Sequence, residues 1–423
     1  MYKPVPVFCR THSRSRTTFQ RNALTAGILL AVLPMAAAAA DDSGDSPAPQ
    51  SESAAAAKDK TTTLGSMQVT ASKRTTLIEK TPMALSAVTA EQLDELGAVD
   101  IKDYAAQVPG LRIQYSGPGA NRISLRGVNS SGEATVGVYY DETPIAGSTG
   151  VSSDAGGRSP DMDLFDVDRI EVLRGPQGTL YGASSMGGAI RILYNKPTQQ
   201  LEGAVKLGHE VTSGGDPSNN QELMLNVPLV KDVLAARVTA YNRDAGGYVD
   251  NSFLGIKNVN SSHAKGAKLQ LRYTPTEDVT VDFSHSRGTT DAFSSSWVPS
   301  YGDYVQRSQV KLPYKDTTQI DSLTLNWDLD WATLTANTSY QHRDSTYVSD
   351  DTYYIQTYRK ASSCASNYGV VSCSAQQLSD WNAYVDGQTP AALIHDGSTR
   401  DRTAEVRLTS ADGGLIDWTV GVF

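Results

Sequence analysis

The sequence has few cysteines, few histidines and one long apolar run, and these shortages exclude several classes of protein. Its 423 residues include three cysteines and six histidines, and no His-Glu-x-x-His pattern or other metal-ligand spacing joins them. Gly182-Ala183-Ser184-Ser185-Met186 lacks the last glycine of a nucleophile elbow, and Gly117-Pro118-Gly119 lacks the third glycine of a dinucleotide loop. We therefore expect no catalytic residue, no metal site and no cofactor.

Positive charge is also scarce. The formal net charge is -9, and the chain has no dense Lys/Arg cluster. Because binding to nucleic acid depends on neutralising phosphates with cations, we expect no nucleic-acid partner. The one apolar run, residues 23–40, follows a basic head without acidic residues and ends in small residues. This pattern predicts a secretory signal peptide over residues 1–40, with a retained anchor helix as the alternative.

Removal of such a signal would take Cys9 with it and leave Cys364 and Cys373. Export to an oxidising compartment favours a disulfide between these two residues, with two free thiols as the alternative. Residues 41–63 form a low-complexity run with little to bury, so we expect a flexible tether.

The chain up to Pro197 then reads as a mixed α/β domain. Thr89 and Gln92 have the spacing of a capping box, and Gly97 stands where that helix should end. Asp100 can cap a second helix, which Pro109-Gly110 would terminate. Short strands with glycine-rich turns are predicted at residues 111–114, 122–126, 136–140, 169–174 and 189–194.

Beyond Pro197 helix signals fade, and apolar and polar residues alternate instead, for example in residues 267–273, 279–283, 323–329 and 332–340. We count nine candidate strands, the last at residues 415–423. Tight connections around residues 231, 276, 330 and 412 alternate with long ones at 246–265, 289–318 and 344–400. Short turns at one end and long loops at the other are typical of a transmembrane barrel, whereas a soluble sandwich, the alternative, has no reason for that segregation.

These patterns predict a mixed fold, in which a small α/β domain precedes the first roughly nine antiparallel strands of a transmembrane β-barrel. The final strand would leave an unpaired edge in lipid, so we expect a truncated barrel.

Ordered motifs within residues 64–197 closely resemble the plug region of TonB-dependent outer-membrane receptors. They are Val108-Pro109-Gly110-Leu111, Ile123-Ser124-Leu125-Arg126-Gly127, Val136-Gly137-Val138-Tyr139-Tyr140-Asp141-Glu142-Thr143-Pro144, the run from Asp163 through Arg169-Ile170-Glu171-Val172-Leu173-Arg174-Gly175 to Gly182, and Gly187-Gly188-Ala189-Ile190-Arg191-Ile192. The resemblance implies a TonB box at residues 64–71, a plug at 72–197 and the N-terminal part of the barrel at 198–423. TonB would add the box to its own sheet as a strand, through Leu64, Met67, Gln68, Val69, Thr70 and Ala71.

The resemblance also implies a location, partners and a function. The chain would lie in the Gram-negative outer membrane, in contact with its lipid, with TonB and its inner-membrane motor complex, and with an imported ligand. Energised uptake of a ferric siderophore is the leading expectation. Uptake of an oligosaccharide or cobalamin, a passive porin or adhesin, and a non-functional truncated receptor are the alternatives.

Two sets of site residues follow from the same comparison. Receptors of this family pair plug arginines with barrel glutamates, so Arg126, Arg174 and Glu405 are predicted to lock the plug to the barrel, with ordinary solvated charges as the alternative. Aromatic residues in the outer loops and at the plug apices, residues 115–120 and 147–159, are predicted to contact the ligand, although some could form interfacial girdles instead. The candidates are Tyr115, Trp297, Tyr301, Tyr353, Tyr354 and Tyr358.

Overall fold

The computed structural model describes residues 67–98, 100–115, 121–130, 132–145, 164–411 and 416–423. Leu64 and the segments predicted as signal peptide and tether lie outside these residues, as does most of the two predicted apical loops. No helix in the described ranges is long and apolar enough to cross a lipid bilayer. The described chain forms an α/β domain (residues 67–197, the plug) followed by a long antiparallel sheet (the wall).

The plug is built on a five-stranded sheet in the order β3, β8, β9, β6, β7. These strands cover, in that order, Leu85–Thr89, Val167–Arg174, Gly188–Tyr194, Val136–Tyr140 and Thr143–Ile145. Only the β6–β9 pair in this sheet is parallel. Two small hairpins flank the sheet and join β1 (Gln68–Val69) to β2 (Thr76–Leu77) and β4 (Leu111–Tyr115) to β5 (Asn121–Leu125). The five predicted plug strands correspond to β4, β5, β6, β8 and β9.

Short capped helices connect the plug strands. The side chain of Thr89 accepts a hydrogen bond from the backbone N–H of Gln92, and the side chain of Gln92 accepts one from the backbone N–H of Thr89, so α1 (Ala90–Glu95) begins with the expected capping box. Asp100 caps α2 (Ile101–Tyr104) in the same way. The other helices in the described part of the plug are η1 (Ile78–Lys80), η2 (Ala105–Gln107) and α3 (Gly178–Tyr181).

The plug has a close-packed apolar core, into which one wall residue inserts. Leu125, Ile170, Val172 and Ile190 are fully buried there, and burying each such side chain stabilises the fold by about 1.5–3 kcal/mol. Ile320, on a wall strand, packs into this cluster. The plug and the wall therefore share part of their apolar packing.

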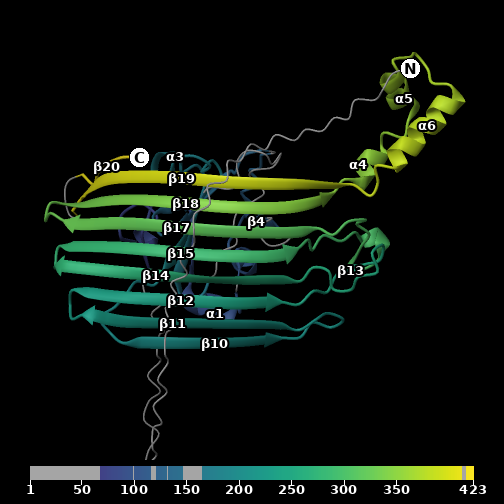
Figure 1. Cartoon of the computed structure of the whole chain (residues 1–423). Helices are drawn as coiled ribbons and strands as arrows, with labels where there is room; N and C mark the ends of the chain where they lie inside the picture. Colours follow the sequence, from purple (N-terminus) through teal and green to yellow (C-terminus); the bar gives the residue numbers. More distant parts are fainter. Residues whose placement is uncertain (1–66, 99, 116–120, 131, 146–163, 412–415) are drawn as a thin grey trace, which may run out of the picture. The chain divides into compact units, whose positions relative to one another are not determined.

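The wall has nine antiparallel strands paired in chain order (Figure 1). They are β10 (Glu202–Glu210), β11 (Ser218–Val230), β12 (Leu234–Ala245), β14 (Ser262–Thr276), β15 (Val279–Phe293), β17 (Pro313–Asp328), β18 (Ala332–Asp350), β19 (Ala392–Ser410) and β20 (Thr419–Val422). The strand number and the tight turns near residues 231, 276 and 330 agree with the sequence prediction, whereas the turn predicted around residue 412 lies outside the described residues. The fold is that of a plug followed by part of a transmembrane β-barrel.

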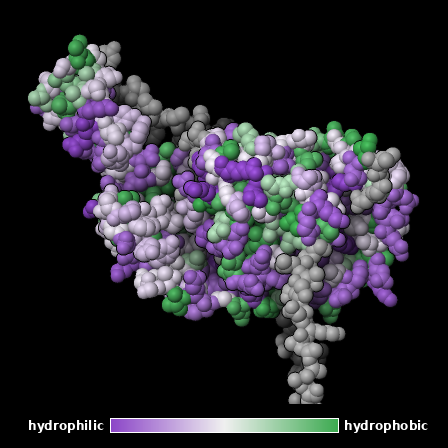
Figure 2. Space-filling model, turned by 180° about the vertical axis from the view of Figure 1, so that it is seen from behind, coloured by the Kyte–Doolittle hydropathy of each residue, from purple (hydrophilic) through white to green (hydrophobic). Residues whose placement is uncertain are grey.

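Alternation along each wall strand separates two chemical faces. Val238, Leu269, Leu323 and Val406 lie on the outer face and are 36–48% exposed. Most residues on the other face are polar and buried, among them Arg237, Gln270, Asn337 and Arg407. This is the division expected of a barrel strand, with an apolar lipid face and a polar lumen face. On the side opposite the view of Figure 1, hydrophilic and hydrophobic residues are interspersed (Figure 2).

The long connections contain more regular structure than the sequence suggested. The connection between β18 and β19 holds three helices, α4 (Thr352–Gln356), α5 (Ala361–Tyr368) and α6 (Ala375–Asp386), which lie beyond the strand ends (Figure 1). The expectation that helix signals fade beyond Pro197 is therefore wrong for this loop. In two other long loops, β13 (Asp250–Asn251) pairs in parallel with β16 (Val305–Gln306), and η4 (Pro299–Tyr301) precedes β16.

Candidate functional site

The strap (residues 67–77, which hold the β1–β2 hairpin) lies between the plug sheet and the wall. Its tight turn places Lys73 at φ +60° and is closed by a hydrogen bond from Lys73 N to Thr70 O of 2.9 Å. Val69 and Ala71 are fully buried. Two residues of the described part of the predicted TonB box are thus packed into the plug, whereas Gln68 is exposed.

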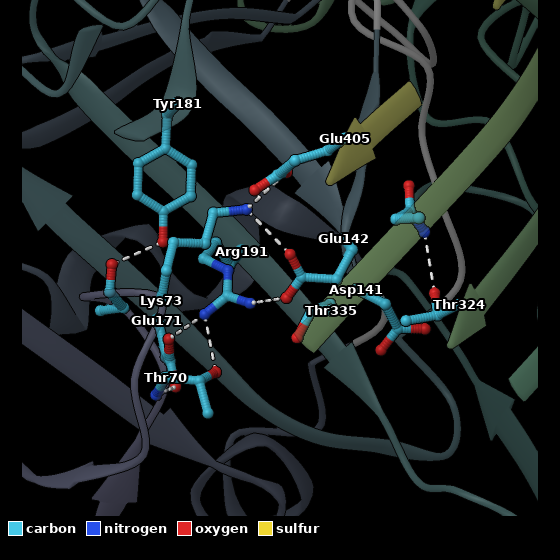
Figure 3. A network of polar contacts seen from close by, with 12 residues as sticks. Thr70, Lys73, Asp141, Glu142, Glu171, Tyr181, Arg191, Thr324, Thr335 and Glu405 are labelled. Carbon is cyan, nitrogen blue, oxygen red and sulfur yellow. Dashed lines mark hydrogen bonds and ion pairs between the residues drawn. The ribbon is translucent and has the colours of Figure 1, made fainter. Parts of the chain in front are cut away.

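Glu142, which follows β6, is the centre of a buried ionic cluster at the contact between plug and wall (Figure 3). Its carboxylate lies 2.8 Å from Lys73 Nζ, 2.8 Å from the Arg191 guanidinium and 2.9 Å from that of Arg407. Arg407 comes from wall strand β19 and also contacts Glu405 at 3.0 Å, and Lys73 reaches Glu405 at 3.3 Å. Lys73 and Arg407 therefore each bridge a plug carboxylate and a wall carboxylate.

The cluster continues into the plug sheet through Arg191 on β9 and Glu171 on β8. These side chains are 1% and 0% exposed and approach to 2.8 Å. Glu171 Oε1 accepts a hydrogen bond from Thr70 N at 2.8 Å, and Arg191 donates to Thr70 Oγ1 at 2.7 Å. Tyr181 donates to the carbonyl of Ala71 at 2.6 Å. Sheet residues thus hold the strap through both its backbone and its side chains.

Burial and charge act against each other on the ionisable groups of this cluster. Burial alone would raise the pKa of Glu142, but Arg191, Lys73 and Arg407 outweigh it and hold that pKa below its ordinary value. Burial, reinforced by Glu405 and Glu142, raises the pKa of Tyr139 to about 12. Glu142 is therefore ionised and Tyr139 neutral at physiological pH.

The predicted lock is only partly the one in the structure. Glu405 does face the plug, but its plug partner is Lys73 rather than Arg126 or Arg174. Arg126 is exposed with φ +53°, and Arg174 ends β8 with its Nε atom buried and unpartnered. In the described ranges, neither arginine forms an ion pair with Glu405. The resemblance alone could not reveal which plug cation the fold brings to β19.

A second ionic tie joins the plug to β12. Both carboxylate oxygens of plug residue Asp166 accept hydrogen bonds from Arg237, at 2.7 and 2.6 Å, and both side chains are almost fully buried. A bidentate pair fixes orientation as well as distance. The polarity is opposite to that of the pair between Lys73 and Glu405, because here the wall supplies the cation.

A cavity of about 690 Å³ lies beside the ionic cluster, between plug and wall. The strap contributes Thr70, Lys73, Arg74 and Thr75 to its lining. Polar wall residues line another side, among them Ser284, Ser322, Thr324 and Thr335. The volume falls in the range of small-molecule sites, but the lining is polar and densely charged, which suits a hydrophilic occupant.

The candidate ligand residues lie apart from this cluster. Tyr353 is 81% exposed, and the hydroxyls of Tyr354 and Tyr358 lie 2.9 Å apart in the helical loop. Trp297 and Tyr301 belong to another long loop, between β15 and β17, and Tyr115 ends β4.

The helical loop is closed by a disulfide between Cys364 and Cys373. The structure thus joins the two cysteines that the sequence pairs. The described residues contain no group of three or more His, Cys, Asp or Glu side chains placed to hold a metal.

Sequence reasoning missed the residues at the centre of the cluster. Glu142, Glu171 and Arg191 lie in the motifs that carry the resemblance and Lys73 lies two residues after the predicted TonB box, but none was assigned a role. The available signal was a charged residue within an otherwise apolar strand, as in Arg169-Ile170-Glu171 and Ile190-Arg191-Ile192. A charge in a buried strand needs a partner, so these residues could have been assigned to an ionic contact.

Comparisons with known proteins agree with this architecture. Residues 78–189 match the family model of the TonB-dependent receptor plug domain. The chain is 29% identical over 238 residues to the pesticin receptor of Yersinia enterocolitica, covering 55% of the chain and 33% of that receptor. It is 29% identical over 184 residues to the ferripyoverdine receptor of Pseudomonas aeruginosa, covering 43% of the chain and 21% of that receptor.

A solved structure shows the same fold. The ferric yersiniabactin uptake receptor of Yersinia pestis aligns with a TM-score of 0.62 at 21% identity, over 80% of the chain and 47% of the receptor. The chain thus spans about a third of the pesticin receptor and just under half of the yersiniabactin receptor.

Proposed function

We propose that the chain serves in energised import of a ferric siderophore across the Gram-negative outer membrane, because residues 78–189 match the TonB-dependent receptor plug domain and the fold is that of a plug with part of a barrel. Support for the cargo comes from the relatives, since the matching proteins include a ferripyoverdine receptor and a ferric yersiniabactin uptake receptor. The observation that carries import, as opposed to passive diffusion, is the plug tied to the wall by buried ion pairs. A passive pore has no need of a stopper that must be displaced.

Energy would enter through residues 64–71. An extended segment can add to the partner's sheet, and its main-chain hydrogen bonds then supply the affinity. The backbone of residues 68–71 is already engaged by β2, Glu171 and Tyr181. TonB would therefore bind first at the N-terminal side of the box and take up the remainder as it leaves the plug.

Ligand contact would fall to the outer loops. The aromatic residues Trp297, Tyr301, Tyr353, Tyr354 and Tyr358 offer large apolar surfaces with polar edges, which suit a ring-bearing ligand. Tyr115 would contribute from the plug.

Two measurements test the function. Pull-down of the folded chain by the periplasmic domain of TonB should succeed with residues 64–71 present and fail when they are replaced by a Gly/Ser segment of equal length. Cells that make this chain should gain growth on ferric siderophores under iron limitation, and should not gain growth under sugar limitation. If growth improved only with an oligosaccharide or cobalamin, the proposed ligand would be wrong and TonB-dependent import would stand. If binding or growth did not depend on TonB, the proposed mechanism would be wrong.

A further inference from the structure

Another cavity, of about 330 Å³, lies among the long loops of the wall (the loop cavity). Its lining residues come from the connections between β10 and β11, between β12 and β14, and between β15 and β17, and none comes from the plug. The volume falls in the range of small-molecule sites. The loop cavity is therefore separate from the cavity beside the ionic cluster.

The parallel pair of β13 with β16 frames the loop cavity. Asn251 pairs with Gln306, and both residues are buried. The side-chain amide of Asn251 donates to the carbonyl and the hydroxyl of Ser308, at 2.9 and 2.8 Å. Its carbonyl oxygen accepts hydrogen bonds from the backbone N–H groups of Phe253 and Leu254, at 3.0 and 2.9 Å. Because these polar groups bind one another, the frame is formed without a ligand.

The loop cavity lies beyond the apolar band of the wall, on the side of its outer face. Phe293 lines it and lies on the same face of β15 as Phe283, because side chains alternate along a strand. Phe283 pairs with Leu323 of the outer face. Phe293 is the last of the 15 residues of β15, whereas about 9–11 residues cross a bilayer. A ligand would therefore enter from the water around the outer loops.

The lining combines an apolar surface with an excess of positive charge. Lys257 and Lys311 are exposed, and within the described ranges neither forms an ion pair. Asp216 is the one acidic residue of the lining. Most of the other lining side chains that are not polar are large, namely Leu254, Ile256, Val259, Phe293 and Leu312. Cations without a partner attract an anion, and apolar walls favour a ligand with an apolar body.

We propose that the loop cavity binds a small, water-soluble organic anion with an apolar body of the size of one or two rings. Its carboxylate would lie against Lys257 and Lys311, and its body against the apolar lining. A neutral sugar would gain nothing from the two lysines, and a lipid chain in the bilayer would not reach the cavity. The site goes beyond the proposed import function, since it includes no plug residue and needs no TonB.

Binding of 2-naphthoate to the chain folded in uncharged detergent micelles tests this site, with protein-free micelles subtracted. Equilibrium dialysis should show saturable binding to the native chain. Lys257→Met together with Lys311→Met should weaken it at least tenfold, because the carboxylate loses both counter-charges. Lys231→Met is the matched control, since Lys231 is exposed in the tight turn between β11 and β12, and it should stay within twofold of native.

An uncharged analogue separates charge from shape. Naphthalene-2-carboxamide should bind the native chain at least tenfold more weakly than 2-naphthoate, and should bind the double lysine variant as it binds the native chain. Val259→Trp, which fills the cavity, should abolish saturable binding of both compounds. Absence of saturable naphthoate binding, binding by the double variant within twofold of native, or equal binding of acid and amide would each overturn the proposal.

Hydrogen exchange shows whether each variant keeps the frame. The backbone N–H groups of Asp250 and Ser252 donate to the carbonyls of Tyr304 and Gln306, at 2.9 and 3.0 Å, and should stay protected in every variant. If Val259→Trp lost this protection, the lysine variant and the amide would still decide the question. A chain with residues 64–71 replaced by Gly/Ser should bind 2-naphthoate as the native chain does. A failed pull-down by TonB would therefore count against the proposed function alone.

Discussion

Replacement of Glu142 by Gln is the most informative single perturbation of the plug–wall contact. It keeps the size of the side chain and removes the charge that faces three cations. Lys73, Arg191 and Arg407 lie 2.8, 2.8 and 2.9 Å from this carboxylate, and their side chains are only 3%, 1% and 10% exposed. Removing one partner from a buried ionic group costs about 3–5 kcal/mol, because the charges left behind remain out of water.

The expected loss is at the lower end of that range, about 3 kcal/mol, because Glu171 still neutralises Arg191 and Glu405 still neutralises Arg407. Urea unfolding of the micelle-bound chain, followed by circular dichroism, would give the change in the free energy of unfolding. Glu79→Gln, at an exposed position of η1, is the control and should change it by less than about 0.5 kcal/mol. A change below about 1 kcal/mol in Glu142→Gln would refute the view that this carboxylate organises the contact.

Three further perturbations probe the same architecture. The pKa of Glu142 is held below its ordinary 4.5 in the folded chain. Its contribution to stability is therefore complete above pH 4.5 and declines as pH falls through the folded value. The urea midpoint of the native chain should accordingly fall more steeply below pH 4.5 than the urea midpoint of Glu142→Gln. Arg237→Lys should destabilise the chain by about 1.5–3 kcal/mol in the same unfolding assay, because lysine cannot donate the bidentate pair to Asp166. Gly188→Ala should cost about 3 kcal/mol or more, since its Cβ would lie 2.1 Å from Leu173 O at φ +148°.

Each of these has a matched control. If the unfolding midpoints of the native chain and of Glu142→Gln fell equally steeply with acid, another carboxylate would be responsible for the loss of stability. Arg287→Lys, on the outer face of β15, should leave stability unchanged, and an equal loss there would contradict the role of Arg237. Gly132→Ala meets nothing within 4 Å, so a loss as large as at Gly188 would point to a general backbone effect.

Local patterns in the sequence predicted most of the fold, because the features that define it are local. Strand alternation, tight turns and the capping box of Thr89 with Gln92 each depend on residues within one element. The α6 helix was missed even though Ser374 and Gln377 carry the same capping box, because the loop length suggested an irregular outer loop.

The ionic cluster could not be predicted in the same way. Lys73 and Glu405 are 332 positions apart, and their meeting depends on the register of every intervening wall strand. The family resemblance suggested Arg126 and Arg174 as the plug cations that pair with the wall. The fold instead brings Lys73 to β19 from the loop between two strands of only two residues each. Strands this short leave no alternation pattern in the sequence by which that loop could be recognised.

The opposite polarity of the two ties between plug and wall has a consequence for how the plug is seated. Because side chains alternate, the plug could shift along a wall strand only by steps of two residues and still meet the lumen face. One such step on β19 would set Lys73 against Arg407, and one on β12 would offer Asp166 only Ala235 or Thr239. A plug with cations alone could shift to any position where acidic residues line the wall. The two ion pairs of opposite polarity instead allow only one position of the plug along the wall strands.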